Sequence, residues 1–249
     1  MPLDAAFLKP VAHRGLHDAA KGRVENSAGA FEAALAKGYG IECDLRPAAC
    51  GTPIVFHDAT LERLVESQGR VLALDAPALK RLKYRGDGSR ILEFADLLEL
   101  VGGRQPLLVE IKSEWEAPDP RFLQRIAALS AAYRGPLGLM SFDPAVMAPL
   151  KELAPGVSRG IVSGLFEGEG WWRDRLGAER AYRLSHFLES RPAAPDFYAY
   201  DVKALPTPVT RFIREVLQLP MFTWTVRTPE EAMTAAKWAD APIFEGFEP

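Results

Sequence analysis

GIECDLRPAACGTPIVFHD occupies residues 40–58 and contains the first indication of the fold. Residues 40–45 form a short apolar strand that carries Glu42 and Asp44 on one face, because alternate side chains of a strand point the same way. The apolar stretch TPIVFH follows too closely for a parallel crossover, which needs about a dozen residues or more. The intervening PAACGT supplies Pro and Gly for a tight return. We therefore predict a hairpin that brings His57 back beside the two acids.

Short apolar or β-branched runs alternate with helical patterns along the rest of the chain, as they do in parallel β/α units. With residues 40–45, the predicted parallel strands are residues 10–13, 107–111, 137–141, 157–162, 197–202, 221–226 and 243–244. Helical patterns fall at residues 27–37, 121–132, 145–153, 179–189, 208–217 and 229–238. Eight such strands in 249 residues predict an α/β protein, a (β/α)8 TIM barrel with its functional groups at the C-terminal strand ends.

Residues 58–104 interrupt this alternation between the second and third barrel strands. Within them Phe94, Leu97 and Leu98 recur at helical spacing, so we predict a small helical cap. The chain is 48% apolar and 25% charged, which fits one large domain better than two. We expect residues 1–249 to form a single barrel domain with this small insertion.

Composition and charge argue against several classes of function. With 30 basic and 33 acidic side chains, the net charge of -3 offers no overall positive field for nucleic acid. No apolar run approaches transmembrane length, and the first residues lack a signal-peptide pattern. We therefore expect no nucleic-acid partner, no stable membrane insertion and a cytoplasmic location. Cys43 and Cys50 are too few for a disulfide framework, and Cys43 is expected to be a small buried hydrophobe.

Three carboxylates are expected at the mouth of the barrel. Glu42 and Asp44 share one strand face, and Glu110 lies near the end of the next barrel strand. Three acids so placed would repel one another unless a cation lay among them. Ligands that are all oxygen favour one hard divalent cation, Mg²⁺ or Ca²⁺. The alternative is that these acids are solvated rim residues or partners of Arg46 and Lys112.

Two of the four histidines, His13 and His57, fall at predicted strand ends on the same rim. A pair of imidazoles can divide general-acid and general-base work near neutral pH. His17 and His186 have no such setting and are interpreted as surface or structural residues. Asp58 either orients His57 or caps the segment that follows.

Fixed cations are predicted beside the same acids. Arg14 directly follows His13, and Lys112 lies two residues after Glu110. Cations together with a divalent ion suit a phosphate ester, and Arg can bind two of its oxygens at once. Gly15 allows either a close approach of the backbone to a ligand or simply a turn with positive φ.

Several short motifs occur in a specific order, and together they resemble one family. The order is HRG, EN, ECD, HD and EIK, beginning at residues 13, 25, 42, 57 and 110, with SFDP, APG, WTV and ADAPIFEGF at residues 141, 154, 224 and 239. This set is similar to that of the glycerophosphodiester phosphodiesterases, within the superfamily of barrels like phosphatidylinositol phospholipase C. The resemblance covers nearly the whole chain.

The resemblance implies an enzyme that hydrolyses a small-molecule glycerophosphodiester to sn-glycerol 3-phosphate and an alcohol. The residues it implies are Glu42, Asp44 and Glu110 as metal ligands, His13 and His57 as the acid/base pair, and Arg14 and Lys112 as phosphate-binding cations. It also implies that Trp224 forms an apolar wall for the glycerol or alcohol part, although ordinary core packing is an alternative. Asn26 matches a residue near the family's active site, with a helix N-cap as the alternative.

The chain also departs from the family's usual pattern. Val24 stands for a common proline, Arg227 for a common asparagine and Glu245 for a usual aspartate, which bears on substrate preference more than on activity. One alternative is that the same site acts on a different substrate, either a lysophospholipid, as in a lysophospholipase D, or another phosphodiester. The stretch LFEGEGWW at residues 165–172 either lines a pocket for an acyl chain or packs onto a helix. A second alternative is a barrel that binds a phosphodiester without turning it over.

Overall fold

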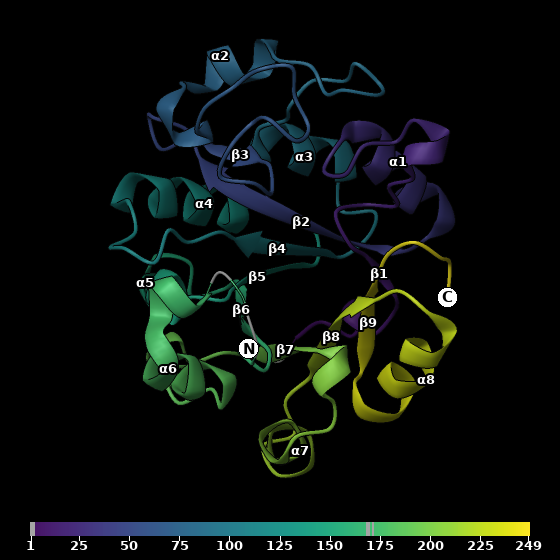
Figure 1. The fold of residues 1–249 in the computed structure, drawn as a ribbon, viewed down its shortest axis with the longest axis vertical. Helices are drawn as coiled ribbons and strands as arrows, with labels where there is room; N and C mark the ends of the chain where they lie inside the picture. The colour runs from purple at the N-terminus through teal and green to yellow at the C-terminus, as the bar shows by residue number, and fades with distance from the viewer. Residues whose placement is uncertain (1–2, 168–169, 171) are drawn as a thin grey trace.

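The computed structural model describes residues 3–167, 170 and 172–249. Among these residues, eight parallel strands close into a barrel, and the strand neighbours run in the order β1, β9, β8, β7, β6, β5, β4 and β2, with β2 paired back to β1 (Figure 1). The strands are β1 (Val11–Ala12), β2 (Gly40–Pro47), β4 (Leu107–Ile111), β5 (Leu137–Ser141), β6 (Ser158–Ser163), β7 (Phe197–Asp201), β8 (Met221–Val226) and β9 (Ala241–Phe244). The predicted TIM barrel is confirmed.

The hairpin predicted after the second barrel strand is present. Strand β3 (Pro53–Val55) runs antiparallel to β2, with Leu45 opposite Val55. On the other side of β2, parallel pairing to β4 places Asp44 opposite Glu110. This register sets two acids from different strands side by side at one height in the barrel.

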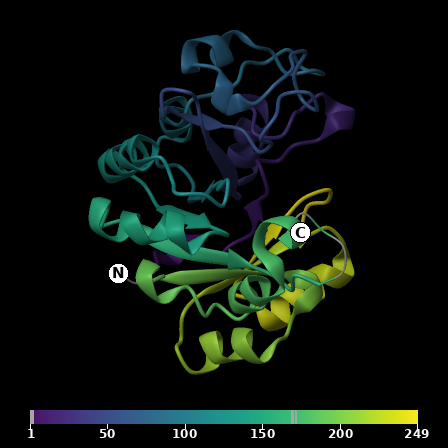
Figure 2. The same ribbon diagram turned by 60° about the vertical axis from the view of Figure 1, so that its left-hand side comes forward.

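Helices surround the strands (Figures 1 and 2). They are α1 (Ala28–Lys37), α2 (Ala76–Arg81), α3 (Phe94–Val101), α4 (Pro120–Ala132), α5 (Pro144–Leu153), α6 (Trp172–Ser185), α7 (Pro208–Glu215) and α8 (Pro229–Trp238). Of the helices within the described ranges, none is both long enough and apolar enough to cross a membrane. The first illustrates how local sequence sets the ends, since Ser27 caps its N-terminus and Gly38 closes it in a left-handed conformation.

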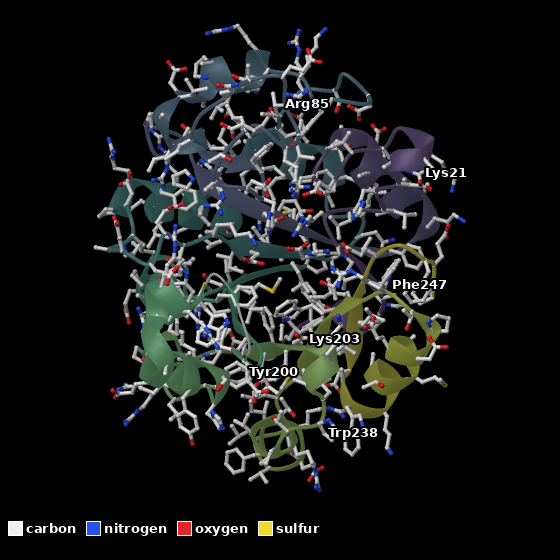
Figure 3. All side chains as sticks on the ribbon, viewed as in Figure 1. Lys21, Arg85, Tyr200, Lys203, Trp238 and Phe247 are labelled. Carbon is white, nitrogen blue, oxygen red and sulfur yellow. The ribbon has the colours of Figure 1, made fainter. Side chains whose placement is uncertain are left out.

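One helix ends earlier in the chain than its sequence pattern predicts. The pattern indicates residues 179–189, whereas α6 ends at Ser185. Phe187 then takes a positive φ of 56° and packs its ring 4.6 Å from Tyr198 and 5.6 Å from Tyr200. Tyr200 lies inside the molecule (Figure 3). Burial of three aromatic rings therefore outweighs continuation of the helix.

The insertion after β3 has a small apolar core of its own. Phe56, Leu61, Val65, Leu79 and Tyr84 are buried together there, and Figure 1 shows this region in blue at one end of the molecule. Helix α3 does not belong to that core, because its apolar face packs with the main core of the barrel. We propose that the insertion proper ends before α3, so that this helix covers the barrel as the other surrounding helices do.

The inside of the barrel is apolar at one end and charged at the other. Side chains such as Phe7, Leu108, Phe197 and Phe222 fill the interior below the acids. Above Leu108 on the same face of β4 lies Glu110, two residues further along the strand. The barrel is thus closed at the bottom, and its charged groups gather where the strands end.

Candidate active site

A cavity of about 650 Å³ opens at the C-terminal ends of the strands. That volume suits a small-molecule ligand. Its lining includes the predicted site residues His13, Arg14, Glu42, His57, Glu110, Lys112 and Trp224. Asp44 and Asn26 are fully buried and make contact with these residues from beneath. The fold therefore brings together all nine residues singled out by the sequence.

The three acids form one compact group. Glu42, Asp44 and Glu110 each offer a carboxylate oxygen, and these oxygens lie within 4.8 Å of one another. Lys112 Nζ lies 2.8 Å from Asp44 Oδ1 and 2.6 Å from Glu110 Oε1. Burial would raise the pKa of Asp44, but the ammonium of Lys112 is the chief influence that holds it below the ordinary carboxyl value. The pairing with Lys112, which the sequence left as an alternative, is thus present for Asp44 and Glu110.

Glu42 has a carboxylate oxygen that the neighbouring protein groups leave without a partner. Its Oε2 accepts a hydrogen bond of 2.9 Å from the Arg14 backbone nitrogen, whereas its Oε1 is buried without a hydrogen-bond partner. Burial, followed by the neighbouring charges of Asp44 and Glu110, raises the pKa of Glu42 well above its usual value. Arg46 forms no ion pair with Glu42, because its guanidinium pairs with Glu114 instead. A buried oxygen without a partner among three carboxylates fits a hard divalent cation.

Arg14 and Asn26 hold this acidic group from the side of β1 and α1. Arg14 Nη1 donates to Glu25 Oε1 at 2.7 Å, and its Nε lies 3.4 Å from Asp44 Oδ2. Asn26 Nδ2 donates to the same Asp44 oxygen at 2.8 Å. The N-cap of α1 is Ser27, so the capping alternative for Asn26 is wrong. The amide of Asn26 instead fixes the orientation of Asp44.

Gly15 shapes the turn that carries Arg14. Its φ is +77°, and a Cβ added there would lie 2.8 Å from the carbonyl carbon of Ala30 in α1. Both the turn and the close packing against the helix therefore require glycine. Because the close neighbour of Gly15 is the backbone of α1, the need for glycine at this position is explained without invoking a bound ligand.

Replacing Gly15 with alanine is expected to destabilise the fold by about 2–4 kcal/mol, the sum of left-handed strain and overpacking. Gly22 is the matched control, because its φ is +67° but an added Cβ there meets nothing within 4 Å. Gly22→Ala should cost only about 1 kcal/mol. Urea unfolding measures both values, and equal losses would contradict the close packing of Gly15 on α1.

His13 is held by a carboxylate from the last strand of the barrel. Its Nδ1 lies 2.5 Å from Glu245 Oε2, and Arg227 Nε holds the other oxygen of Glu245 at 2.7 Å. Because an ionised carboxylate only accepts, Nδ1 carries the hydrogen and Nε2 is left toward Glu42 Oε2, 3.9 Å away. Burial lowers the pKa of His13, and the bond to Glu245 opposes part of that shift. His17 also lies near Glu245, with its Nε2 at 3.4 Å from Oε2, so it contacts the carboxylate that holds His13.

His57 is held in the same manner by the residue that follows it. Its Nδ1 lies 2.7 Å from Asp58 Oδ1, which leaves Nε2 available at the cavity. Arg63 donates to both oxygens of Asp58, at 2.6 and 2.9 Å, and to both oxygens of Glu25, each at 2.7 Å. Burial would raise the pKa of Asp58, but hydrogen bonds from His57 and Arg63 hold it below the ordinary value. Asp58 therefore orients His57.

One wall of the cavity is apolar. The Trp224 ring packs edge-on against Phe142 with centroids 5.1 Å apart, and both side chains line the cavity. Trp224 therefore joins the core and borders the site at once. Leu165, Phe166 and Trp172 extend this lining, whereas Trp171 lies outside the described residues.

The sequence prediction missed three residues that hold the site together. Glu245 and Arg227 were noted only as departures from a pattern, and Arg63 was not singled out. The spacing of Asp58 and Arg63, five residues apart in HDATLER, is the one sequence signal that could have found the latter. Their roles depend on contacts between distant segments, with 232 positions separating His13 from Glu245.

Comparison with known proteins agrees with this arrangement. The model of the glycerophosphoryl diester phosphodiesterase family matches residues 13–245, which begin at the first cavity histidine and end at its carboxylate partner. The chain belongs to this family. A glycerophosphodiester phosphodiesterase of Caldanaerobacter subterraneus subsp. tengcongensis is 29% identical over 192 residues, or 71% of this chain and 74% of that protein. "Probable glycerophosphodiester phosphodiesterase 1" of Mycobacterium tuberculosis is 28% identical over 168 residues, 58% of this chain and 60% of its own.

Solved structures of glycerophosphodiester phosphodiesterases share the barrel. An Oleispira antarctica phosphodiesterase in complex with the product sn-glycerol-3-phosphate has a TM-score of 0.72 at 18% identity, covering 95% of this chain and 92% of that one. The enzyme from Thermotoga maritima has a TM-score of 0.70 at 23% identity, covering 95% and 93%. The family likeness seen in the sequence motifs is confirmed, and these distant structures establish the fold.

Proposed function

We propose that this protein hydrolyses glycerophosphodiesters to sn-glycerol 3-phosphate and an alcohol, with His13 and His57 as the acid/base pair. The observation that carries the proposal is that two histidines line one cavity, each with Nδ1 on a carboxylate and Nε2 available to a bound molecule. Family membership supports the reaction class. The product bound in the Oleispira antarctica relative supports glycerol 3-phosphate as the product here.

The two histidines have complementary tasks in this reaction. One accepts the proton of the glycerol hydroxyl next to the phosphate as that oxygen attacks phosphorus. The other gives a proton to the alcohol oxygen as the bond between that oxygen and phosphorus breaks. The cyclic phosphate so formed is then opened by water, with the histidines exchanging roles. Arg14 and Lys112 supply fixed positive charge beside the phosphate oxygens.

Glu42, Asp44 and Glu110 would hold one divalent cation, either Mg²⁺ or Ca²⁺. Bound there, the cation would polarise a phosphate oxygen and lower the pKa of the neighbouring hydroxyl. The buried, unpartnered Oε1 of Glu42 supports this assignment, since neither Lys112 nor Arg14 satisfies it. The cation is therefore expected to be required for turnover.

Release of glycerol 3-phosphate by purified protein tests the proposal. The panel contains glycerophosphodiesters and lysophospholipids, each with added Mg²⁺ or Ca²⁺ and again with chelator. Release that chelator abolishes and metal restores is the expected result. Folded protein that releases nothing with either metal would overturn the proposed hydrolysis and favour a barrel that only binds phosphodiesters.

A lysophospholipid is the second candidate substrate. Leu165, Phe166 and Trp172 extend the apolar lining beyond Phe142 and Trp224, as an acyl chain would require. In the same panel this candidate predicts a higher kcat/KM for a lysophospholipid than for the glycerophosphodiester with the same head group.

A cytoplasmic location, where water-soluble phosphodiesters are available, remains a prediction.

The insertion also contributes to the proposed mechanism through Arg63. This one guanidinium binds Asp58, which orients His57, and Glu25, which binds Arg14. A proposed proton-transfer group and a proposed phosphate-binding group therefore share one support. Arg63 does not line the cavity itself, so it acts through the residues it holds.

Arg63→Ala is expected to lower kcat about 10- to 100-fold, because His57 and Arg14 lose their fixed geometry. Added guanidinium ion should restore part of the lost rate, whereas a general loss of folding would not respond to it. The control is Arg85→Ala, also on the insertion (Figure 3), which is expected to retain activity because the Arg85 side chain hydrogen-bonds, within the part of the chain that the structure describes, only to the Val65 carbonyl. Equal kcat in Arg63→Ala and wild type would contradict this role.

A further inference from the structure

A second group of charged residues lies beside the proposed catalytic group and is not used by it. Arg46 Nη1 lies 2.8 Å from Glu114 Oε1, and Arg70 Nη2 lies 2.6 Å from Glu114 Oε2. Arg175 Nη1 is 3.9 Å from that second oxygen and donates to the Glu114 carbonyl at 3.3 Å. Three guanidinium groups thus share the single carboxylate of Glu114.

Arg70, Glu114 and Arg175 border a hollow of about 370 Å³, which we call the Glu114 hollow. Its lining consists of Arg70, Leu72, Glu114, Trp115, Glu116 and Arg175. Glu114, Trp115 and Arg175 also line the main cavity, so the two spaces adjoin. Arg46 links them as well, because its Nε donates to the His57 carbonyl at 2.6 Å.

The charged group around the Glu114 hollow is positive on balance. The lining itself carries two arginines and two glutamates, and Glu116 makes no ion pair among the described residues. Arg46, which pairs with Glu114 from the main cavity, adds a third cation to this group. The side chains of Arg70 and Arg175 are 54% and 51% exposed, so their donors remain accessible. An arginine fork matches phosphate oxygens well. The hollow is therefore suited to an anionic group and unsuited to a cationic one.

Only one part of the substrate can use this charge. The glycerol part is the same in every glycerophosphodiester and carries no charge of its own. The phosphodiester is already accounted for by Arg14, Lys112 and the cation. The positively charged group of Arg46, Arg70 and Arg175 around Glu114 can therefore discriminate only among leaving alcohols, favouring one that bears a phosphate over a neutral or cationic one.

We propose that the Glu114 hollow is a subsite for an anionic group on the leaving alcohol, recognised by Arg70 and Arg175. The proposal rests on the hydrolysis proposed above and narrows its substrate class. Preferred substrates are glycerophosphodiesters whose alcohol carries a phosphate, and those with a quaternary ammonium group are disfavoured.

A matched pair of substrates tests the subsite. Glycerophosphoinositol 4-phosphate and glycerophosphoinositol release the same glycerol 3-phosphate and differ by one phosphate. Their kcat/KM ratio in wild type is expected to be about 10 or more, the scale of a charge-assisted hydrogen bond. In the double variant Arg70→Gln, Arg175→Gln the ratio should fall toward one. Added NaCl should also lower the wild-type ratio, because half-exposed charges are screened.

Controls separate this effect from others. Arg211→Gln removes an exposed arginine that pairs with Glu215 on α7 and should leave the ratio unchanged. Glycerophosphocholine should have the lowest kcat/KM of the three compounds in wild type. A wild-type ratio near one, or a double variant with the wild-type ratio, would overturn the subsite.

Binding provides a readout that does not depend on hydrolysis. Titration calorimetry of the inositol pair on His13→Ala protein is expected to give a Kd about 10-fold lower for the phosphorylated compound. If wild type hydrolyses nothing, the proposed hydrolysis fails, and the Kd comparison still tests the subsite. Equal Kd values for the pair would overturn it. Inorganic phosphate that binds in an arginine-dependent way while the pair binds equally would assign the hollow to free phosphate and overturn the substrate preference.

Discussion

Glu42→Gln is expected to lower turnover by at least about 10³-fold and yet leave the metal-free protein no less stable. The loss follows because a divalent cation supplies several kcal/mol of charge stabilisation, and about 1.4 kcal/mol corresponds to tenfold in rate. Stability is preserved because Glu42 is a buried carboxylate whose Oε1 has no partner, next to two further acids. Replacing an uncompensated buried charge by a neutral group of similar shape removes a cost.

Thermal unfolding separates the two effects. With chelator present, the Tm of Glu42→Gln should equal or exceed that of wild type. Added Mg²⁺ or Ca²⁺ should raise the wild-type Tm, since a ligand at 100 times its Kd stabilises by about 2.7 kcal/mol, and should leave the variant's Tm unchanged. Glu32→Gln on the exposed face of α1 is the control, with wild-type turnover and metal response. A variant that keeps both turnover and the metal-dependent rise in Tm would exclude Glu42 as a ligand.

The fold was predictable because its signals are local. Short apolar strands alternate with helices along the sequence. The link between β2 and β3 is too short for a parallel crossover, so the two strands form a hairpin. The proposed metal ligands followed from the same local rule, because strand periodicity puts Glu42 and Asp44 on one face. Where a distant contact competes with local pattern, prediction failed, as at Phe187, which leaves the helix to pack on Tyr198 and Tyr200.

The proposed supports of the histidines were not predictable in the same way. Glu245 reaches His13 only because β1 and β9 are neighbours in the closed barrel, which places Ala12 opposite Phe244. Arg63 reaches Glu25 only through the fold of the insertion. The sequence thus indicates the candidate groups of the site, whereas barrel closure and the insertion determine how those groups are held.

His13→Ala and His57→Ala are each expected to lower kcat by about 10²- to 10⁴-fold on an alkyl phosphodiester such as glycerophosphoglycerol. Each change removes the Nε2 of an imidazole ring. In the wild type a carboxylate bonded to Nδ1, Glu245 for His13 and Asp58 for His57, fixes that ring. Turnover by purified protein measures the loss. His186→Ala is the control, since among the described residues its ring hydrogen-bonds only to Tyr182 and Ser185, at the end of α6.

A substrate with an activated leaving group then separates the two roles. With sn-glycero-3-phospho-p-nitrophenol, the departing oxygen is stable as an anion and needs no proton, whereas the attacking hydroxyl still needs a base. One of the two variants should therefore recover most of its rate of p-nitrophenol release in the first turnover, before the cyclic phosphate is opened, and that histidine is the acid of the first step. The other should stay as slow as before, and that histidine is the base. Recovery of both variants or of neither would contradict a mechanism in which the proton is removed by one imidazole and delivered by the other.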